Sequence, residues 1–216
     1  MNATPIAELR DPELESQVVE LYSPDLAYHN FQHALDTIEA ANDITLKCME
    51  EGIRVDTRVV YYAVLFHDAG FRDDHHALGF ESKEAYSADL ATVRLRQRGV
   101  AGKICDKVAD AVLSTRIDAG FVTTEQKAVR AADLSGLAAG YEVFRENSAN
   151  LKSEYELFHC AKLKWPEWVD SARKTINFYL SQEIRLTSYF SNAEGESAFH
   201  KAVRRNLERL VAEAGI

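Results

Sequence analysis

The strongest constraint on the fold is the spacing of apolar residues, which recur every three or four positions along most of the chain. One helical face is marked by Phe31, Leu35 and Ile38, and another by Val108 and Val112. The alternation of period two that a half-buried strand needs is sustained nowhere. With only 10 Gly and 4 Pro in 216 residues, disordered chains and turn-rich β-sandwiches are also disfavoured. The sequence therefore predicts an all-α protein.

Residues typical of helix N-termini divide the chain into separate predicted helices. Asp11 before Pro12 is typical of an N-cap followed by proline at the first helical position. The segments Thr123–Gln126 and Ser153–Glu156 have the spacing of capping boxes. We therefore expect a bundle of about nine to ten helices, at about residues 12–21, 30–50, 56–68, 80–98, 102–114, 124–135, 140–150, 154–162, 166–189 and 196–213.

The length of the chain favours a single domain over residues 1–216. A chain of this size can bury about 70% of the surface that its unfolded form exposes. The sequence contains no evident linker, no low-complexity stretch and no repeat of 20 to 50 residues. Neither a two-domain split nor a solenoid is therefore predicted.

The charge of the chain excludes some partners. Its formal net charge of −9 repels nucleic acids and anionic membranes, so neither is expected as a partner, whereas a small phosphate ester held by a metal remains compatible. The longest apolar run, VVYYAVLF at 59–66, is far shorter than the roughly 18 residues of a membrane span. The first residues include acids where an export signal needs basic and then apolar residues. Because the three cysteines are far apart, a reducing cytoplasmic location is expected.

The first candidate functional residues directly follow the most apolar predicted helix. Val59 to Phe66 is apolar on all sides, which is typical of a helix in the middle of a bundle. The next residues are His67 and Asp68, and two such groups at the edge of an apolar core are costly to bury unless something pairs them. A metal ion is one such pairing, and an ordinary capped helix end is the alternative.

Two other segments carry comparable signals. His29 and His33 are four residues apart at the start of a predicted helix and hence lie on one face. Asp133 lies in AVRAADLSGLA, a run poor in charge, where an isolated buried carboxylate would be costly. Taken singly, the histidines could line the core or the surface, and the aspartate could cap a helix. Along the chain the three signals follow the order His, His-Asp, Asp.

In this order the motifs resemble the HD-domain superfamily of metal-dependent phosphohydrolases, an all-helical fold named after the His-Asp dyad. YHNFQHALDTI at 28–38 is similar to the YHN-x-x-H opening of that family, and LFHDAGF at 65–71 to its dyad segment. Glu84 with Ser87-Ala88 resembles the E-x-x-S-A that often follows. STR at 114–116 and AADLSGL at 131–137 are similar to the closing region. The resemblance covers about residues 25–190, with the C-terminal helix appended.

The resemblance implies a metal centre held by His33, His67, Asp68 and Asp133. Two imidazoles and two carboxylates suit one divalent transition metal, namely Mn, Fe, Co, Ni or Zn. A metal-bound water would then attack phosphorus. The catalytic residues would be Asp68 and His29, which by resemblance protonates the leaving alkoxide. The alternative for His29 is a hydrogen-bonding role beside the ligands.

Three further residues are expected to contact the substrate. Arg72 and Arg116 could each hold phosphate oxygens, because a guanidinium matches two of them at once. Glu84, from the E-x-x-S-A segment, is the third. For the two arginines a solvated surface position is the alternative.

The chain departs from some members of the family. Deoxynucleotidase-like HD proteins usually carry a Glu a few residues past the dyad, where this chain has Phe71 and Arg72, which argues against that activity. Members with two metals need further His ligands before the last Asp, and only His75 and His76 occur there. A second His-ligated metal is therefore not predicted. A Mg²⁺ ion bridged by Asp68 stays open, as does a polar surface loop as the role of His75 and His76.

Together these features predict a phosphodiesterase or phosphomonoesterase that acts on a small phosphate ester, a nucleotide or cyclic nucleotide. The main alternative is a regulatory module that binds metal and nucleotide but turns over poorly. A di-iron oxygenase of the same fold would need more His ligands, and a scaffold without a site would carry no stoichiometric metal. Dimerisation through the final helix also stays open.

Overall fold

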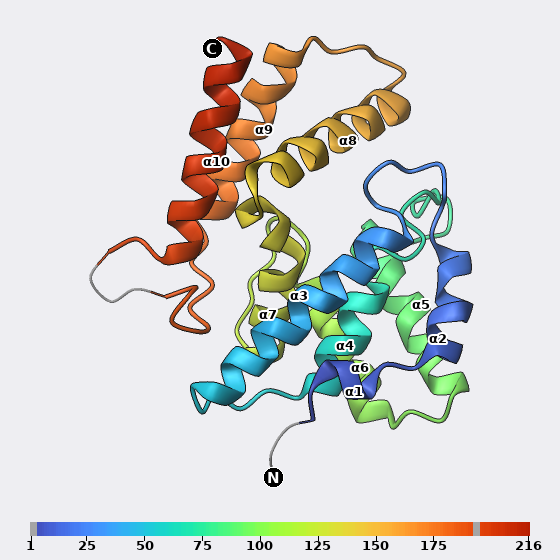
Figure 1. Ribbon diagram of the computed structural model, residues 1–216. Coiled ribbons are helices and arrows are strands. Elements are labelled where there is room, and N and C mark those ends of the chain that lie inside the picture. Colours follow the sequence, from blue (N-terminus) through green and yellow to red (C-terminus); the bar gives the residue numbers. More distant parts are fainter. Residues whose placement is uncertain (1–3, 192–194) are drawn as a thin grey trace. The chain divides into compact units, whose positions relative to one another are not determined.

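The computed structural model describes residues 4–191 and 195–216, and this part of the chain is all-helical (Figure 1). The prediction of an all-α bundle of about nine to ten helices is confirmed: ten α-helices are described. Their bounds are α1 Ile6–Leu9, α2 Pro12–Val18, α3 Phe31–Glu50, α4 Thr57–Phe66, α5 Lys83–Gln97, α6 Gly102–Leu113, α7 Thr124–Asp133, α8 Tyr141–His159, α9 Trp165–Leu180 and α10 Ala198–Ala214.

The helices form two compact units, Met1–Asp133 and Leu134–Ile216. The prediction of one domain over 1–216 stays a prediction. None of the described helices is both long enough and apolar enough to cross a membrane.

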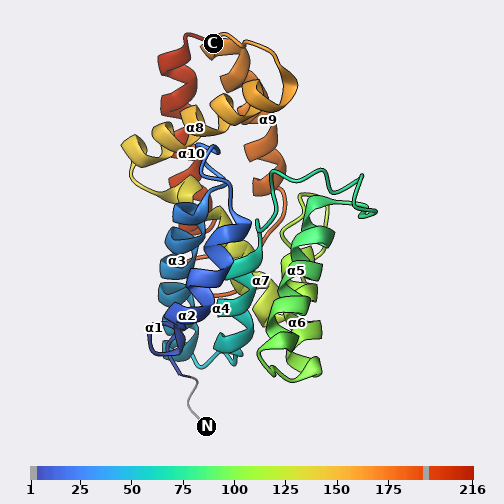
Figure 2. The same cartoon turned by 90° about the vertical axis from the view of Figure 1, so that its right-hand side faces the viewer.

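In the first unit α4 is the central helix, as its apolar sequence predicts. It packs against α3, α5, α6 and α7, and Figure 2 shows it between α3 and the pair α5 and α6. Every residue from Val59 to Phe66 except Tyr62 is fully buried. Truncating a core residue such as Phe66 to Ala would cost about 3–5 kcal/mol. This helix therefore ends against a rigid core.

The second unit consists of the short 3-10 helix η2 (Leu134–Ala138) and α8, α9 and α10. Two helices were expected at 140–150 and 154–162, and this prediction is wrong because one continuous helix, α8, spans both. Ser153 does not cap a helix; its hydroxyl donates to the carbonyl of Ala149, as serine inside a helix often does. The helix expected at 166–189 ends at Leu180.

Several expected helix starts are confirmed. The Asp11 carboxylate accepts from the backbone N–H of Leu14 at 3.0 Å. Thr123 and Gln126 form the reciprocal bonds of a capping box, since each backbone N–H donates to the other's side chain.

Candidate metal centre

The first ligand candidate, His33, is positioned by the cap of α3. The Asn30 side chain accepts from the backbone N–H groups of Gln32 and His33, at 2.9 and 3.3 Å. Its amide group also donates to the carbonyl of Leu26, which fixes the entry of the chain into the helix. His33 is thereby held in the first turn of α3, and its side chain is 9% exposed.

His67 and Asp68 follow α4 directly, and two hydrogen bonds to the segment before α3 hold the chain on either side of them. The buried hydroxyl of Tyr22 donates to the carbonyl of Leu65, in the last turn of α4. The backbone N–H of Gly70 donates to the carbonyl of Leu21. Gly70 has a φ of +72°, and a Cβ there would collide with the ring of Tyr86. A glycine is therefore required at the turn that follows the dyad.

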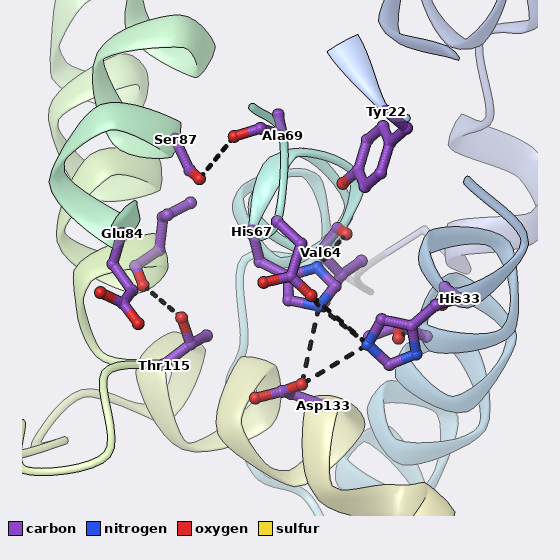
Figure 3. Close-up of polar contacts among 12 residues, drawn as sticks. Tyr22, His33, Val64, His67, Ala69, Glu84, Ser87, Thr115 and Asp133 are labelled. Atoms are coloured by element: carbon purple, nitrogen blue, oxygen red, sulfur yellow. Dashed lines mark hydrogen bonds and ion pairs between the residues drawn. The ribbon is translucent and has the colours of Figure 1, made fainter. Parts of the chain in front are cut away.

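The four predicted ligand residues lie together, and Figure 3 shows His33, His67 and Asp133 among them. His33, His67 and Asp68 are buried, whereas the side chain of Asp133 is 22% exposed. His67 Nδ1 donates to the carbonyl of Val64 at 2.8 Å, so Nε2 faces the cluster. His67 Nε2 lies 3.0 Å from Asp68 Oδ2, 3.3 Å from His33 Nε2 and 3.6 Å from Asp133 Oδ1. His33 Nε2 lies 3.6 Å from Asp68 Oδ2 and 3.8 Å from Asp133 Oδ1.

These separations fit a metal centre. Ligand atoms bound about 2.1 Å from a metal lie about 3.0 Å apart at octahedral corners and about 3.4 Å apart at tetrahedral ones. His33, His67 and Asp68 form the tightest group, with ligand atoms all within 4.8 Å of one another. A backbone carbonyl on the outer nitrogen of His67 is also typical of metal-binding imidazoles. The buried group His33–His67–Asp68 could therefore hold a metal ion.

The electrostatics of the side chains favour a cation at this place. Burial by itself raises the pKa of Asp68, but the charges of His67, Lys83 and His29 outweigh it and hold that pKa well below its ordinary value. Burial likewise raises the pKa of Asp133, and its bonds to His33 and His67 reverse the effect. Both carboxylates are thus kept ionised. Burial by itself lowers the pKa of His67, but Asp68 and Asp133 outweigh it and raise that pKa well above its ordinary value. The two carboxylates therefore attract positive charge, which a metal ion bound to His67 would supply in place of a proton.

His29 lies beside the cluster, and its ring contacts are aromatic. Its ring stacks on Phe71 at 3.8 Å between centroids and 11° between planes. It meets the ring of His33 edge-on at 6.0 Å, and Tyr28 packs on both imidazoles. The structure thus brings His29 close to His33. It does so from the loop before α3 and not from one helix face, because α3 begins at Phe31 after its cap, Asn30.

Glu84, the third expected substrate contact, is linked to Asp68 through Lys83. It is buried at the start of α5, with its Oε1 3.7 Å from the ammonium of Lys83. Lys83 Nζ in turn lies 3.5 Å from Asp68 Oδ1. Ser87, three residues along, donates to the carbonyl of Ala69 and ties α5 to the turn after the dyad. The first turns of α5 therefore contact the dyad segment through Lys83, just before the E-x-x-S-A segment, and through Ser87 within it.

The structure does not bring the two predicted arginines against the ligand atoms. Within residues 4–191 and 195–216, Arg72 has its ion-pair partner in Asp25, at 4.0 Å on the surface. Arg116 pairs with Asp118 at 2.6 Å and Glu81 at 3.8 Å.

The loop after the dyad also carries two further histidines. His75 is partly exposed and His76 is exposed, and their rings lie 4.2 Å apart. Their neighbour Asp73 accepts from the hydroxyl of Tyr86 at 3.1 Å. These contacts are those of a polar surface loop.

Sequence reasoning missed three residues that support the centre: Tyr22, Lys83 and Arg130. Arg130 is 1% exposed, and its guanidinium donates to the carbonyls of Thr115, Arg116 and Ile117. A charge in the apolar run before Asp133 could have signalled this role. Lys83 could have been found because a cation is unusual at the first position of a helix.

Comparison with known proteins adds no assignment: no family model and no curated protein matches this chain.

Proposed function

We propose that this protein is a metal-dependent hydrolase of small phosphate esters, of the HD type that its motifs resemble. The observation that carries the proposal is the convergence of two imidazoles and two carboxylates from three distant segments on one buried point. A set of nitrogen and carboxylate ligands suits a divalent transition ion such as Mn, Fe, Co, Ni or Zn. When bound, such an ion lowers the pKa of a water and polarises a phosphoryl oxygen.

The residues around the ligands are suited to handle the substrate. His29 lies in the loop before α3, with its ring 6.0 Å from that of His33 and outside the tightest ligand group, where its imidazole can deliver a proton to a leaving alkoxide. Phe71, stacked on His29, fixes the plane of that ring. The expected substrate is a nucleotide or cyclic nucleotide, and the expected cofactor is one divalent ion, with a second Mg²⁺ ion compatible with the exposed side of the centre.

The proposal is tested by comparing the wild type with Asp68→Ala and Asp68→Asn. Asp43→Ala is the matched control, because Asp43 is an exposed carboxylate on α3, the helix that carries His33. Each protein is loaded with Mn, Co, Ni, Fe, Zn or Mg, its metal content is measured, and hydrolysis of mono-, di- and cyclic nucleotides is followed.

We expect the wild type and Asp43→Ala to bind metal and hydrolyse at least one substrate class. Both Asp68 variants should lose the metal and the activity while their helical circular dichroism is retained. Unchanged metal content in the Asp68 variants would refute the ligand assignment. A wild type that binds metal and hydrolyses nothing would favour the regulatory binding module instead.

A further inference from the structure

The cation that faces the metal centre from α5 is Lys83, a residue without an assigned role. It is the first residue of α5, directly after the N-cap Ser82, whose hydroxyl accepts from the backbone N–H of Ala85. Its ammonium lies 3.5 Å from Asp68 Oδ1, 3.7 Å from Glu84 Oε1 and 4.0 Å from the centre of the Phe71 ring.

Both carboxylate contacts of Lys83 are longer than a charge-assisted hydrogen bond, which is about 2.7–2.9 Å. The ammonium carries three N–H donors, so these ion pairs leave it donors for another acceptor. Its side chain is 36% exposed, whereas those of Asp68 and Glu84 are 7% and 8% exposed. Lys83 is thus the most exposed of these three side chains.

A structural role explains Lys83 poorly. The start of a helix is the positive end of its macrodipole, so a lysine at this position destabilises α5. Ion pairs of partly exposed lysines contribute little to stability. Residues that break a local rule without a structural gain are concentrated at functional sites.

Phe71 keeps Lys83 apart from His29. One face of the Phe71 ring is covered by the His29 imidazole, stacked at 3.8 Å. An ammonium only 4.0 Å from the same centroid must therefore lie over the opposite face. The imidazole of His29 and the ammonium of Lys83 therefore lie on opposite faces of one apolar ring.

The carboxylate of Asp68 connects Lys83 to the ligands. Its Oδ2 faces His67 at 3.0 Å, and its Oδ1 faces Lys83 at 3.5 Å. An anion held beside the ligand atoms would meet repulsion from Asp68, and Lys83 is the nearby cation that offsets it.

We propose that Lys83 binds a nonbridging oxygen of the substrate's phosphate group, the role that the sequence suggested for Arg72 and Arg116. This inference deepens the proposed function and rests on it. Lys83 holds the phosphate on one side of Phe71, while His29 faces the leaving group on the other. The two arginines are engaged with surface carboxylates instead.

The test measures binding of inorganic phosphate to the Mn-loaded protein by calorimetry, which does not depend on turnover. The wild type is compared with Lys83→Met, which keeps the length of the side chain without its charge, and with Lys83→Arg. Lys107→Met, at an exposed position of α6, is the control for loss of one positive charge.

We expect phosphate affinity to fall at least tenfold in Lys83→Met, to be partly kept in Lys83→Arg and to be unchanged in Lys107→Met. Metal content should not fall in Lys83→Met, because a cation is removed from beside the ligands. Equal phosphate affinity in Lys83→Met and the wild type would overturn the inference. So would metal loss in Lys83→Met, or a metal-loaded wild type that binds no phosphate.

The same proteins separate this inference from the proposed function. If phosphate binding depends on Lys83 but no ester is hydrolysed, the hydrolase proposal fails and the anion site stands. If esters are hydrolysed and Lys83→Met leaves both KM and phosphate affinity unchanged, the hydrolase stands and the role of Lys83 is refuted.

Discussion

Replacing Arg130 by methionine should destabilise the first unit, although Arg130 is not among the ligand candidates. Its Nη1 donates to the carbonyl of Thr115 at 2.6 Å, in a buried bond, and to that of Arg116 at 3.1 Å. Its Nη2 donates to the carbonyl of Ile117 at 3.3 Å. Arg130 thus ties the loop after α6 to α7, three residues before Asp133.

The size of the effect follows from these three bonds. A hydrogen bond from a charged donor contributes about 1.5–3 kcal/mol when it is buried, and the two partly buried bonds contribute less. Methionine keeps most of the apolar volume of arginine, so no large cavity should form. We therefore expect a loss of about 3 kcal/mol, which for a chain of this size lowers the melting temperature by about 10 °C.

Thermal unfolding followed by circular dichroism measures this loss. Arg96→Met is the control, because Arg96 is an exposed arginine paired with Asp106 at 3.6 Å, and its removal should change stability by less than about 0.5 kcal/mol. Metal affinity should also fall in Arg130→Met, since α7 positions Asp133. An unfolding temperature equal to that of the wild type would refute the argument that Arg130 fixes this loop.

Two further predictions concern His29 and Glu156. His29→Gln should keep the metal but lower turnover by about 10²–10⁴-fold for esters with alkoxide leaving groups, and by much less for nitrophenyl esters, which need no proton; an equal loss for both classes would argue against an acid role. The side chain of Lys152 and the backbone N–H of Leu163 lower the pKa of Glu156 from 4.5 to about 2. Its contribution to stability is therefore complete above about pH 4.5 and is lost as the pH falls toward 2. Glu156→Gln should be less stable than the wild type at pH 7 and match it near pH 2 in urea unfolding; a constant difference between the two would contradict this assignment.

The sequence predicted the fold class well because helical periodicity is a local property. The central position of α4 followed from a run that is apolar on all sides, and its burial confirms this. The end of α4 was placed two residues too late, at 68 instead of Phe66. That end depends on the bond from Tyr22 to Leu65 and the bond from Gly70 to Leu21, which join segments more than 40 residues apart.

The candidate ligands, which the structure brings together, could be picked out because most of them were costly in their own sequence context. His67 and Asp68 ended an apolar run, and Asp133 stood in a segment poor in charge. The substrate contacts expected at Arg72 and Arg116 stay predictions. The affinity of a guanidinium for phosphate gives no information on its distance from the centre, and the ion pairs of both arginines are with Asp25 and with Asp118 and Glu81.

Phe71 departs from the motif, and only the structure shows which groups its ring contacts. In the sequence it is an apolar residue near the place where the deoxynucleotidase-like HD proteins, which the motifs resemble, usually carry a Glu. In the structure its ring carries His29 on one face and the ammonium of Lys83 on the other. A carboxylate at that place would pair with both groups and hold them together, whereas an apolar ring separates them and leaves their polar atoms directed elsewhere. The absence of the Glu therefore fits a centre in which a proton donor and an anion-binding cation act on different parts of one substrate.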